Sequence, residues 1–183
     1  AMELRAAIAQ LPEARLHDVL EAQLVGSVLE GASLKHHELI DVADVQAPLR
    51  IRVEATVPRL AQNVGGQLLL APPFMPKVSQ LTTLPKRLTP LLLALPTSQW
   101  TTLRVKLPAG TAVVSRLTPV DVDEQGRRVQ VHDRVEAGNV LVLDRLLEIP
   151  TGRVPTDRYE NLVEFARTAD EALTTPVRIE ATH

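Results

Sequence analysis

Arg128-Val129-Gln130-Val131-His132-Asp133-Arg134-Val135 opens the segment 127–173, which decides the fold. Its valines fall on alternate residues and polar side chains stand between them, except that Asp133 is a polar residue in the valine register. Alternation with a period of two is typical of a strand that is buried on one side only. We therefore predict a half-buried strand with one exception on its apolar face.

A hairpin and a helix follow this strand in the sequence. Gly138 and Asn139 stand where a tight turn needs positive φ angles, which these two residue types adopt at low cost. A second, more apolar strand is predicted over 140–149. The spacing of apolar residues then predicts a helix over about 156–173 and a short last strand over about 177–180.

The N-terminal third is less regular. Apolar spacing predicts a short helix over about 2–11. Residues 14–28 fit both a helical and a strand period, and we favour the strand. The cleanest alternation in the chain covers 48–57 and predicts a strand whose register is strongly specified, since a slip of one residue would turn its apolar side chains to water.

The middle of the chain combines a proline-rich segment with further strands. Residues 72–85 contain four prolines, which lack an amide donor, so we expect an ordered surface loop there. Strands are predicted over 88–95, 99–107 and 111–122, the last with an edge position or a break at Pro119. Short strands separated by turn signals are typical of an antiparallel sandwich.

The expected fold class is therefore mainly β. We expect an antiparallel β-sandwich over about 14–150, with a short N-terminal helix and a C-terminal helix packed on it. All 183 residues are expected to form a single β-rich domain, which is long enough to bury a core of its own.

Composition argues against several classes of function. The 20 basic and 22 acidic residues nearly cancel, so no basic surface for nucleic acid is expected. Aromatic residues make up only 2%, too few for the stacking platforms that bind single strands. The chain contains no cysteine, which excludes thiol catalysis, disulfides and thiolate metal sites within it. No apolar run approaches the length of a membrane span.

Several groups of residues are of the types that form catalytic or metal sites. His36 and His37 are adjacent, but neighbouring residues of a strand point to opposite faces and chelate one metal poorly. No nucleophile elbow accompanies the isolated histidines His17, His132 and His183, although counting residues leaves a Ser-His-Asp triad open. We therefore predict no catalytic residue, no metal ligand and no cofactor.

Two glycines and a group of acids support only structural roles. Gly65-Gly66 lacks the following lysine and helix start of a phosphate loop, so we expect a tight turn there. The acids Asp121, Asp123 and Glu124 stand in a segment too short for an EF-hand, and we expect solvated turn residues.

A candidate interaction surface combines arginines around the C-terminal helix with aromatic residues elsewhere. Arg153, Arg158 and Arg167 surround the start and the outer side of the helix, where they could dock an acidic patch. Phe74 and Trp100 are the aromatic candidates for this surface.

From residue 87 onward the order of motifs resembles a known family. The matching elements are Arg87-x-x-Pro90-Leu91, Val105-Lys106-Leu107-Pro108-Ala109-Gly110, the hairpin with Gly138, Leu141 to Arg145, and Arg153-Val154-Pro155-x-x-x-Tyr159. This order is similar to the C-terminal β-rich domain of bacterial DUF3857-type transglutaminase-like proteins. Such proteins join a β-rich N-terminal domain, a papain-like transglutaminase core and a β-rich C-terminal domain.

The resemblance implies a non-catalytic accessory or interaction module that docks its own upstream catalytic domain or another protein. The family's catalytic Cys, His and Asp belong to the core domain, so no catalytic residue is carried over to this chain. The resemblance alone favours an extracytoplasmic location, in the periplasm or cell envelope. Two other hypotheses are a stand-alone ligand-binding or adhesion sandwich, with Trp100 or Phe74 exposed in a concave pocket, and, more remotely, a small hydrolase.

Overall fold

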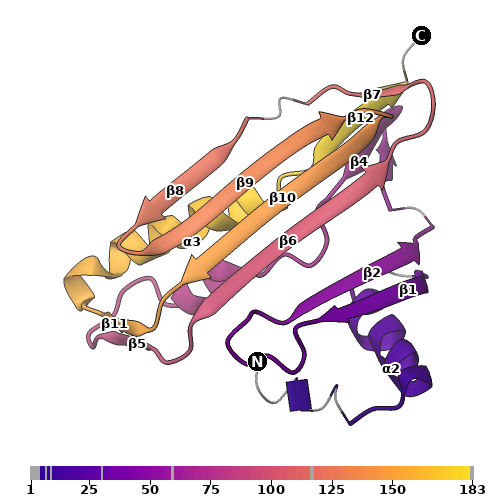
Figure 1. The fold of residues 1–183 in the computed structure, drawn as a ribbon. Coiled ribbons are helices and arrows are strands. Elements are labelled where there is room, and N and C mark those ends of the chain that lie inside the picture. The colour runs from indigo at the N-terminus through magenta and orange to yellow at the C-terminus, as the bar shows by residue number, and fades with distance from the viewer. Residues whose placement is uncertain are drawn as a thin grey trace. The chain divides into compact units, whose positions relative to one another are not determined.

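The computed structural model describes residues 5–6, 8, 10–29, 31–58, 60–115 and 118–181. The chain forms two compact units, residues 1–60 and 61–183, each with a hydrophobic core of its own (Figure 1). The expected fold class is confirmed, since the described residues are mainly antiparallel strands with a helix toward each end, consistent with a β-sandwich. The single domain over all 183 residues stays a prediction.

The first unit packs helices against a two-stranded hairpin. The α-helix α2 (Glu13–Val19) continues directly into the π-helix η1 (Leu20–Val25), whose Gly26 amide donates to the Glu21 carbonyl at 2.7 Å. The strands β1 (Ser33–Ile40) and β2 (Arg50–Thr56) pair antiparallel. The strand predicted over 48–57 is thereby confirmed.

The strand favoured over 14–28 is wrong, and with it the expected start of the sandwich at residue 14. Leu16, Leu20 and Val25 are all buried in the core of this unit, which follows the helical rather than the strand period. This core packs against the apolar residues of β2, such as Ile51 and Val53. The sequence of this segment fits both a helix and a strand, and the helix forms because it buries these residues against the hairpin.

Part of the helix predicted over about 2–11 is observed. Arg5, Ala6 and Ile8 are helical, Gln10 and Leu11 already lie in a turn, and residues 1–4, 7 and 9 lie outside the described residues. The buried Arg5 guanidinium donates to backbone carbonyls of the β1–β2 connection, at 3.1 Å for Val42. These bonds attach the N-terminal turn to the hairpin.

The second unit is built on a four-stranded antiparallel sheet in the order β6-β10-β9-β8 (Figure 1). The predicted hairpin is confirmed as β9 (Arg127–Glu136) and β10 (Val140–Ile149), which flank a turn with φ of 79° at Gly138 and 59° at Asn139. The two outer strands are β6 (Thr97–Lys106) and β8 (Val120–Glu124).

A terminal helix covers one face of this sheet. The 3-10 turn η3 (Thr156–Arg158) leads into α3 (Tyr159–Thr174), close to the helix predicted over 156–173. Its apolar stripe contributes the following buried residues to the core: Tyr159, Leu162, Phe165, Ala166, Ala169 and Leu173. They pack with sheet residues such as Val129, Leu147 and Ile149.

Two smaller sheets complete the second unit. The first has the order β3-β4-β12-β7, and its strands are β3 (Gln62–Val64), β4 (Gln67–Leu70), β12 (Val177–Ala181) and β7 (Thr111–Val113). The second pairs β5 (Leu91–Leu93) with β11 (Gly152–Val154). The tight turn expected at Gly65-Gly66 joins β3 to β4, and both glycines have positive φ angles.

Two predicted strands are shorter than expected. Only 91–93 of the strand predicted over 88–95 is formed, and Pro90, which lacks an amide donor, stands directly before it. Residues 111–122 divide into β7, which ends at Val113, and β8, which begins at Val120 directly after Pro119. The break expected at this proline is confirmed. Strand β8 instead runs on to Glu124, so Asp121, Asp123 and Glu124 lie on a strand and not in a turn.

The proline-rich segment 72–85 is ordered, as expected, and packs on α3. It contains the 3-10 helix η2 (Val78–Thr82), and Val78 is buried in the core. The carboxylate of Asp170 on α3 accepts the Val78 amide at 2.6 Å and the Ser79 amide at 3.2 Å. Asp170 thus satisfies two amides at the start of η2 that the short helix itself leaves without partners.

Candidate functional site

The sheet β6-β10-β9-β8 carries two groups of interacting charged side chains, one on each face. Successive residues of a strand point to opposite faces, so the sheet has an inner face under α3 and an outer face turned away from it. The buried Leu147 and Ile149 belong to the inner face. The outer face includes these residues in register: Trp100, Thr102, Arg104, Gln130, His132, Arg134, Glu136, Val142, Asp144 and Leu146.

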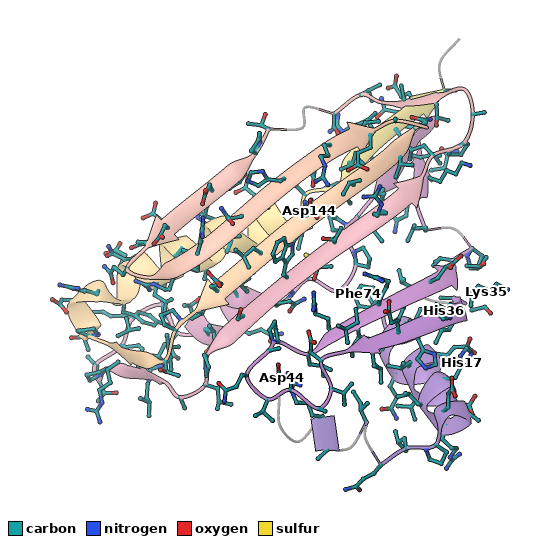
Figure 2. The ribbon with its side chains drawn as sticks, viewed as in Figure 1. His17, Lys35, His36, Asp44, Phe74 and Asp144 are labelled. Carbon is teal, nitrogen blue, oxygen red and sulfur yellow. The ribbon has the colours of Figure 1, made fainter. Side chains whose placement is uncertain are left out.

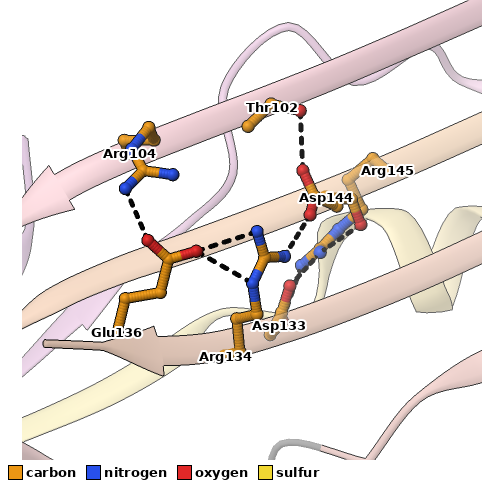
Figure 3. A network of polar contacts seen from close by, with 7 residues as sticks. All are labelled: Thr102, Arg104, Asp133, Arg134, Glu136, Asp144 and Arg145. Atoms are coloured by element: carbon orange, nitrogen blue, oxygen red, sulfur yellow. Dashed lines mark hydrogen bonds and ion pairs between the residues drawn. The ribbon is translucent and has the colours of Figure 1, made fainter.

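A network of charged side chains crosses the outer face from β6 to β9 (Figure 3). Arg104 donates to Glu136 at 2.5 Å, and Arg134 contacts the other oxygen of Glu136 at 3.0 Å. Arg134 also donates to Asp144, whose second oxygen accepts the Thr102 hydroxyl at 2.6 Å. Asp144 lies near the middle of β10 (Figure 2), so the network joins three strands.

These contacts shift the pKa values of the two carboxyl groups. The hydrogen bond from Arg104 lowers the pKa of Glu136, with a further contribution from Arg134. Burial alone would raise the pKa of Asp144, but the hydrogen bonds from Thr102 and Arg134 outweigh it and the pKa is lowered. Both groups are therefore carboxylates at neutral pH, their oxygens already accept hydrogen bonds from Thr102, Arg104 and Arg134, and they are poor general bases.

The inner face carries one charged pair among its apolar residues. Arg145 on β10 donates from both terminal nitrogens to the two carboxylate oxygens of Asp133 on β9, at 2.9 Å for the second bond, and the side chains are only 2% and 11% exposed. Arg145 also donates to the Asp144 carbonyl at 3.1 Å, but its buried Nε has no partner. Asp133 is the polar exception in the valine register.

A cavity of about 130 Å³ adjoins this pair. Its lining combines polar groups and aliphatic surface: Ser115, Thr118, Val120, Val131, Asp133, Arg145, Ala172, Thr175, Pro176 and Val177. It is smaller than the roughly 300–1,000 Å³ of ordinary small-molecule sites. Neither Trp100 nor Phe74 lines it, so it is not the concave pocket with an exposed Trp100 or Phe74 that would favour a ligand-binding sandwich.

The residues of the expected interaction surface do not come together. Trp100 is 76% exposed on the outer face, beside Leu146 of β10. Arg167 is exposed on α3, which covers the inner face, and lies 4.0 Å from Glu171. Arg153 is exposed on β11 and Arg158 ends η3.

Phe74, the remaining candidate, is half-buried in the proline-rich segment, with a φ of 64°. Its carbonyl accepts a hydrogen bond of 2.8 Å from Gln99 on β6, and Gln99 belongs to the inner face because it pairs with Leu147. Phe74 therefore lies on the other side of the sheet from Trp100.

The histidines of the first unit lie near one another. His17 on α2 and His37 on β1 have ring centroids 5.6 Å apart, while His36 is exposed on β1 (Figure 2). Among the residues that the structure describes, no three His, Cys, Asp or Glu side chains gather in an arrangement that could hold a metal ion. His132 of the second unit is exposed, as its place on the polar side of β9 indicated.

Sequence reasoning missed most of the charged networks. Asp133 was marked by its place in the valine register, but its partner Arg145 stands among apolar residues with no comparable signal. Arg104, Thr102 and Asp144 come together only through the antiparallel register of β6 with β10.

Comparisons with known proteins give one match. No curated protein and no solved structure matches the chain. Within the described part of the chain, no helix is both long and apolar enough to cross a membrane. The family model DUF3858, described as a "Domain of Unknown Function with solved-structure structure", matches residues 66–179. This range includes the whole sheet of the outer face and α3, and covers more than half of the sequence, so the chain belongs to the DUF3858 family.

Proposed function

We propose that this chain is a non-catalytic accessory module of a transglutaminase-like protein and that it docks the upstream papain-like domain of that protein. The observation that carries the proposal is the outer face of the sheet, where Trp100 on the edge strand β6 is 76% exposed beside an ordered array of paired charges. The motif order described above supports the link to transglutaminase-like proteins.

The chemistry of the outer face suits docking better than catalysis. Its arginines and carboxylates are paired with one another, so they are held in fixed positions without being poised for proton transfer. Trp and Arg are the residue types most enriched among the residues that dominate binding energy at interfaces. Here Arg104, Arg134 and Trp100 share one face of a rigid sheet.

The packing beneath these charges also favours an interface. Val142 is fully buried although it belongs to the outer face, where it lies in register between Arg104 and Arg134. The aliphatic stems of long arginine side chains can cover apolar surface while their charged ends face water. The outer face thus presents a preorganised layer of charge over an apolar base.

The first test is the gene around this chain. The proposal expects an in-frame upstream domain with Cys, His and Asp in papain-like order. If the reading frame encodes no such domain, the proposal is overturned.

The second test measures binding of that domain to the 183-residue chain by calorimetric titration. Trp100→Ala should weaken the complex by about tenfold or more, as expected when a large exposed aromatic side chain becomes buried at an interface. Leu92→Ala is the matched control, because Leu92 is also an exposed apolar residue, at 61%, but lies on β5. No binding by the wild-type chain, or equal loss in both variants, would contradict docking on the outer face.

A further inference from the structure

Two histidines of the first unit come together from different secondary-structure elements. His17 lies on α2, beside the buried Leu16, and His37 lies on β1. Their ring centroids are 5.6 Å apart and the ring planes are tilted by 55°, so the imidazoles are close but not stacked. Both residues are half-buried. The fold of one compact unit therefore holds two imidazoles next to each other.

The register of β1 directs His37 toward the helix. His37 is opposite Val53 on β2, and Leu39, two residues further along β1, is opposite Ile51. Leu39, Ile51 and Val53 all pack on the hydrophobic core that α2 shares. Because successive residues of a strand alternate between faces, His37 belongs to the face that α2 covers, and the exposed His36 belongs to the other face.

We propose that His17 and His37 together bind one Zn²⁺ ion and so link α2 to β1. Imidazole nitrogen is a ligand that suits zinc and the related divalent transition metals. Among the residues that the structure describes, no third His, Cys, Asp or Glu forms a group with these two, so water would fill the remaining coordination positions. The inference does not depend on the proposed docking of an upstream domain.

The spacing of the two rings fits a shared metal ion. A bond from Zn²⁺ to a histidine nitrogen is about 2.0–2.1 Å long, which puts the metal about 3 Å from the centre of each ring. Two histidines at a tetrahedral angle then have ring centres about 5 Å apart. The observed separation of 5.6 Å is close to this value, so only a small adjustment of the side chains is needed.

Glu21 adds a fixed negative charge to the same interface. It stands on η1, four residues after His17, and its carboxylate accepts the Leu34 amide of β1 at 2.7 Å. This hydrogen bond joins the same helical segment to the same strand as the two histidines do. A carboxylate near the imidazoles favours a cation, and carboxylates in the outer shell of zinc sites commonly orient the ligating histidines.

The experiment titrates the 183-residue chain with Zn²⁺ alone in a calorimeter, in a buffer that does not bind metals. The wild-type chain should bind one ion in the micromolar range. His17→Gln and His37→Gln each remove one imidazole, and each should weaken binding by about tenfold or more, since even the loss of an outer-shell partner typically costs roughly 10–100-fold. Because a ligand that binds the folded state stabilises it, Zn²⁺ should also raise the Tm of the wild type more than that of either variant.

The matched control is His36→Gln. His36 is adjacent to His37 and its ring centroid is 6.5 Å away, but it lies on the exposed face of β1, so this variant should bind Zn²⁺ like the wild type. If circular dichroism shows that His37→Gln does not fold, His17→Gln tests the same site from the helix. A wild-type chain that binds no Zn²⁺ up to millimolar concentration would overturn the proposal. Equal weakening in His36→Gln and His17→Gln would also overturn it, because binding would then not depend on the pair between α2 and β1.

Discussion

Two Asp–Arg pairs of the central hairpin have the same composition but lie on opposite faces of the sheet. Asp133-Arg134 on β9 and Asp144-Arg145 on β10 are identical dipeptides on neighbouring strands. Because consecutive residues of a strand alternate between faces, Asp133 meets Arg145 on the inner face and Arg134 meets Asp144 on the outer face. The period of a strand thus distributes four adjacent charges into two separate pairs.

The surroundings of the two pairs differ sharply. The side chains of Asp133 and Arg145 are 11% and 2% exposed, and those of Asp144 and Arg134 are 22% and 47% exposed. Asp144 also belongs to a network with Thr102, Arg134 and, through Arg134, Glu136, whereas Arg145 retains an Nε without a partner. Breaking the Asp133–Arg145 pair should therefore lower the free energy of unfolding much more than breaking the Asp144–Arg134 pair.

The largest effect is expected when the inner pair is broken from one side. Asp133→Val places valine in the register of Val129 and Val131 but leaves the buried Arg145 charge without its carboxylate. Removing one partner of a buried pair typically costs about 3–5 kcal/mol of unfolding free energy. Urea unfolding of both proteins measures this difference, and a loss below about 1 kcal/mol would show that water reaches Arg145.

The next variant restores neutrality on the inner face. Asp133→Val combined with Arg145→Met replaces both charges with apolar side chains next to the 130 Å³ cavity. Because the desolvation cost of both charges disappears, the double variant should regain most of the stability lost in Asp133→Val. The same urea unfolding series completes a double-mutant cycle. A double variant less stable than Asp133→Val would mean that the pair specifies the packing of the inner face.

The sequence predicted the elements of this hairpin because their signals are local. The alternation of Val129, Gln130 and Val131 follows directly from one buried face, and the positive φ angles of Gly138 and Asn139 follow from the turn. Asp133 broke the alternation and so marked one charged residue on the inner face of β9. No local signal in the sequence identifies Arg145 as its partner, because the two residues lie on different strands and meet only through the register of β9 with β10.

Where local patterns were ambiguous, packing decided. Leu16, Leu20 and Leu24 fit either period, and their helical form depends on packing against the β1–β2 hairpin, which is the next element of the chain. The outer-face network was likewise beyond prediction, because Arg104 and Glu136 come from strands that meet only through the order β6-β10-β9. Trp100 was a sequence candidate for a surface, and its 76% exposure agrees with such a place.

A smaller effect is expected from the outer pair. Asp144→Val removes the acceptor of Arg134 and Thr102, but Arg134 remains exposed to water and keeps its contact with Glu136. Exposed ion pairs contribute little to stability because solvent screens them. Urea unfolding at neutral pH should therefore show a loss far below that of Asp133→Val. Equal losses would contradict the contrast between the two faces.

The smallest effect is a change in how stability depends on pH. The pKa values of Glu136 and Asp144 are lowered in the folded chain from ordinary values of 4.5 and 3.8. A group whose pKa is lowered in the folded state stabilises the fold when the pH is above the ordinary pKa of that group. This contribution is lost as the pH falls through the pKa of the folded state. The stability from these two groups should thus be constant near neutral pH and decline below pH 4.5.

Asp144→Asn isolates one of these two groups, because asparagine can still accept the Thr102 hydroxyl but does not titrate. Unfolding free energies measured at steps between about pH 6 and about pH 3 should fall less steeply for Asp144→Asn than for the wild type. Asp121→Asn is the control on β8, since Asp121 lies 3.7 Å from Arg128 outside the network. If Asp144→Asn and Asp121→Asn follow the wild-type curve alike, Arg134 does not stabilise the Asp144 carboxylate in solution, and the outer network is a layer of solvated charges.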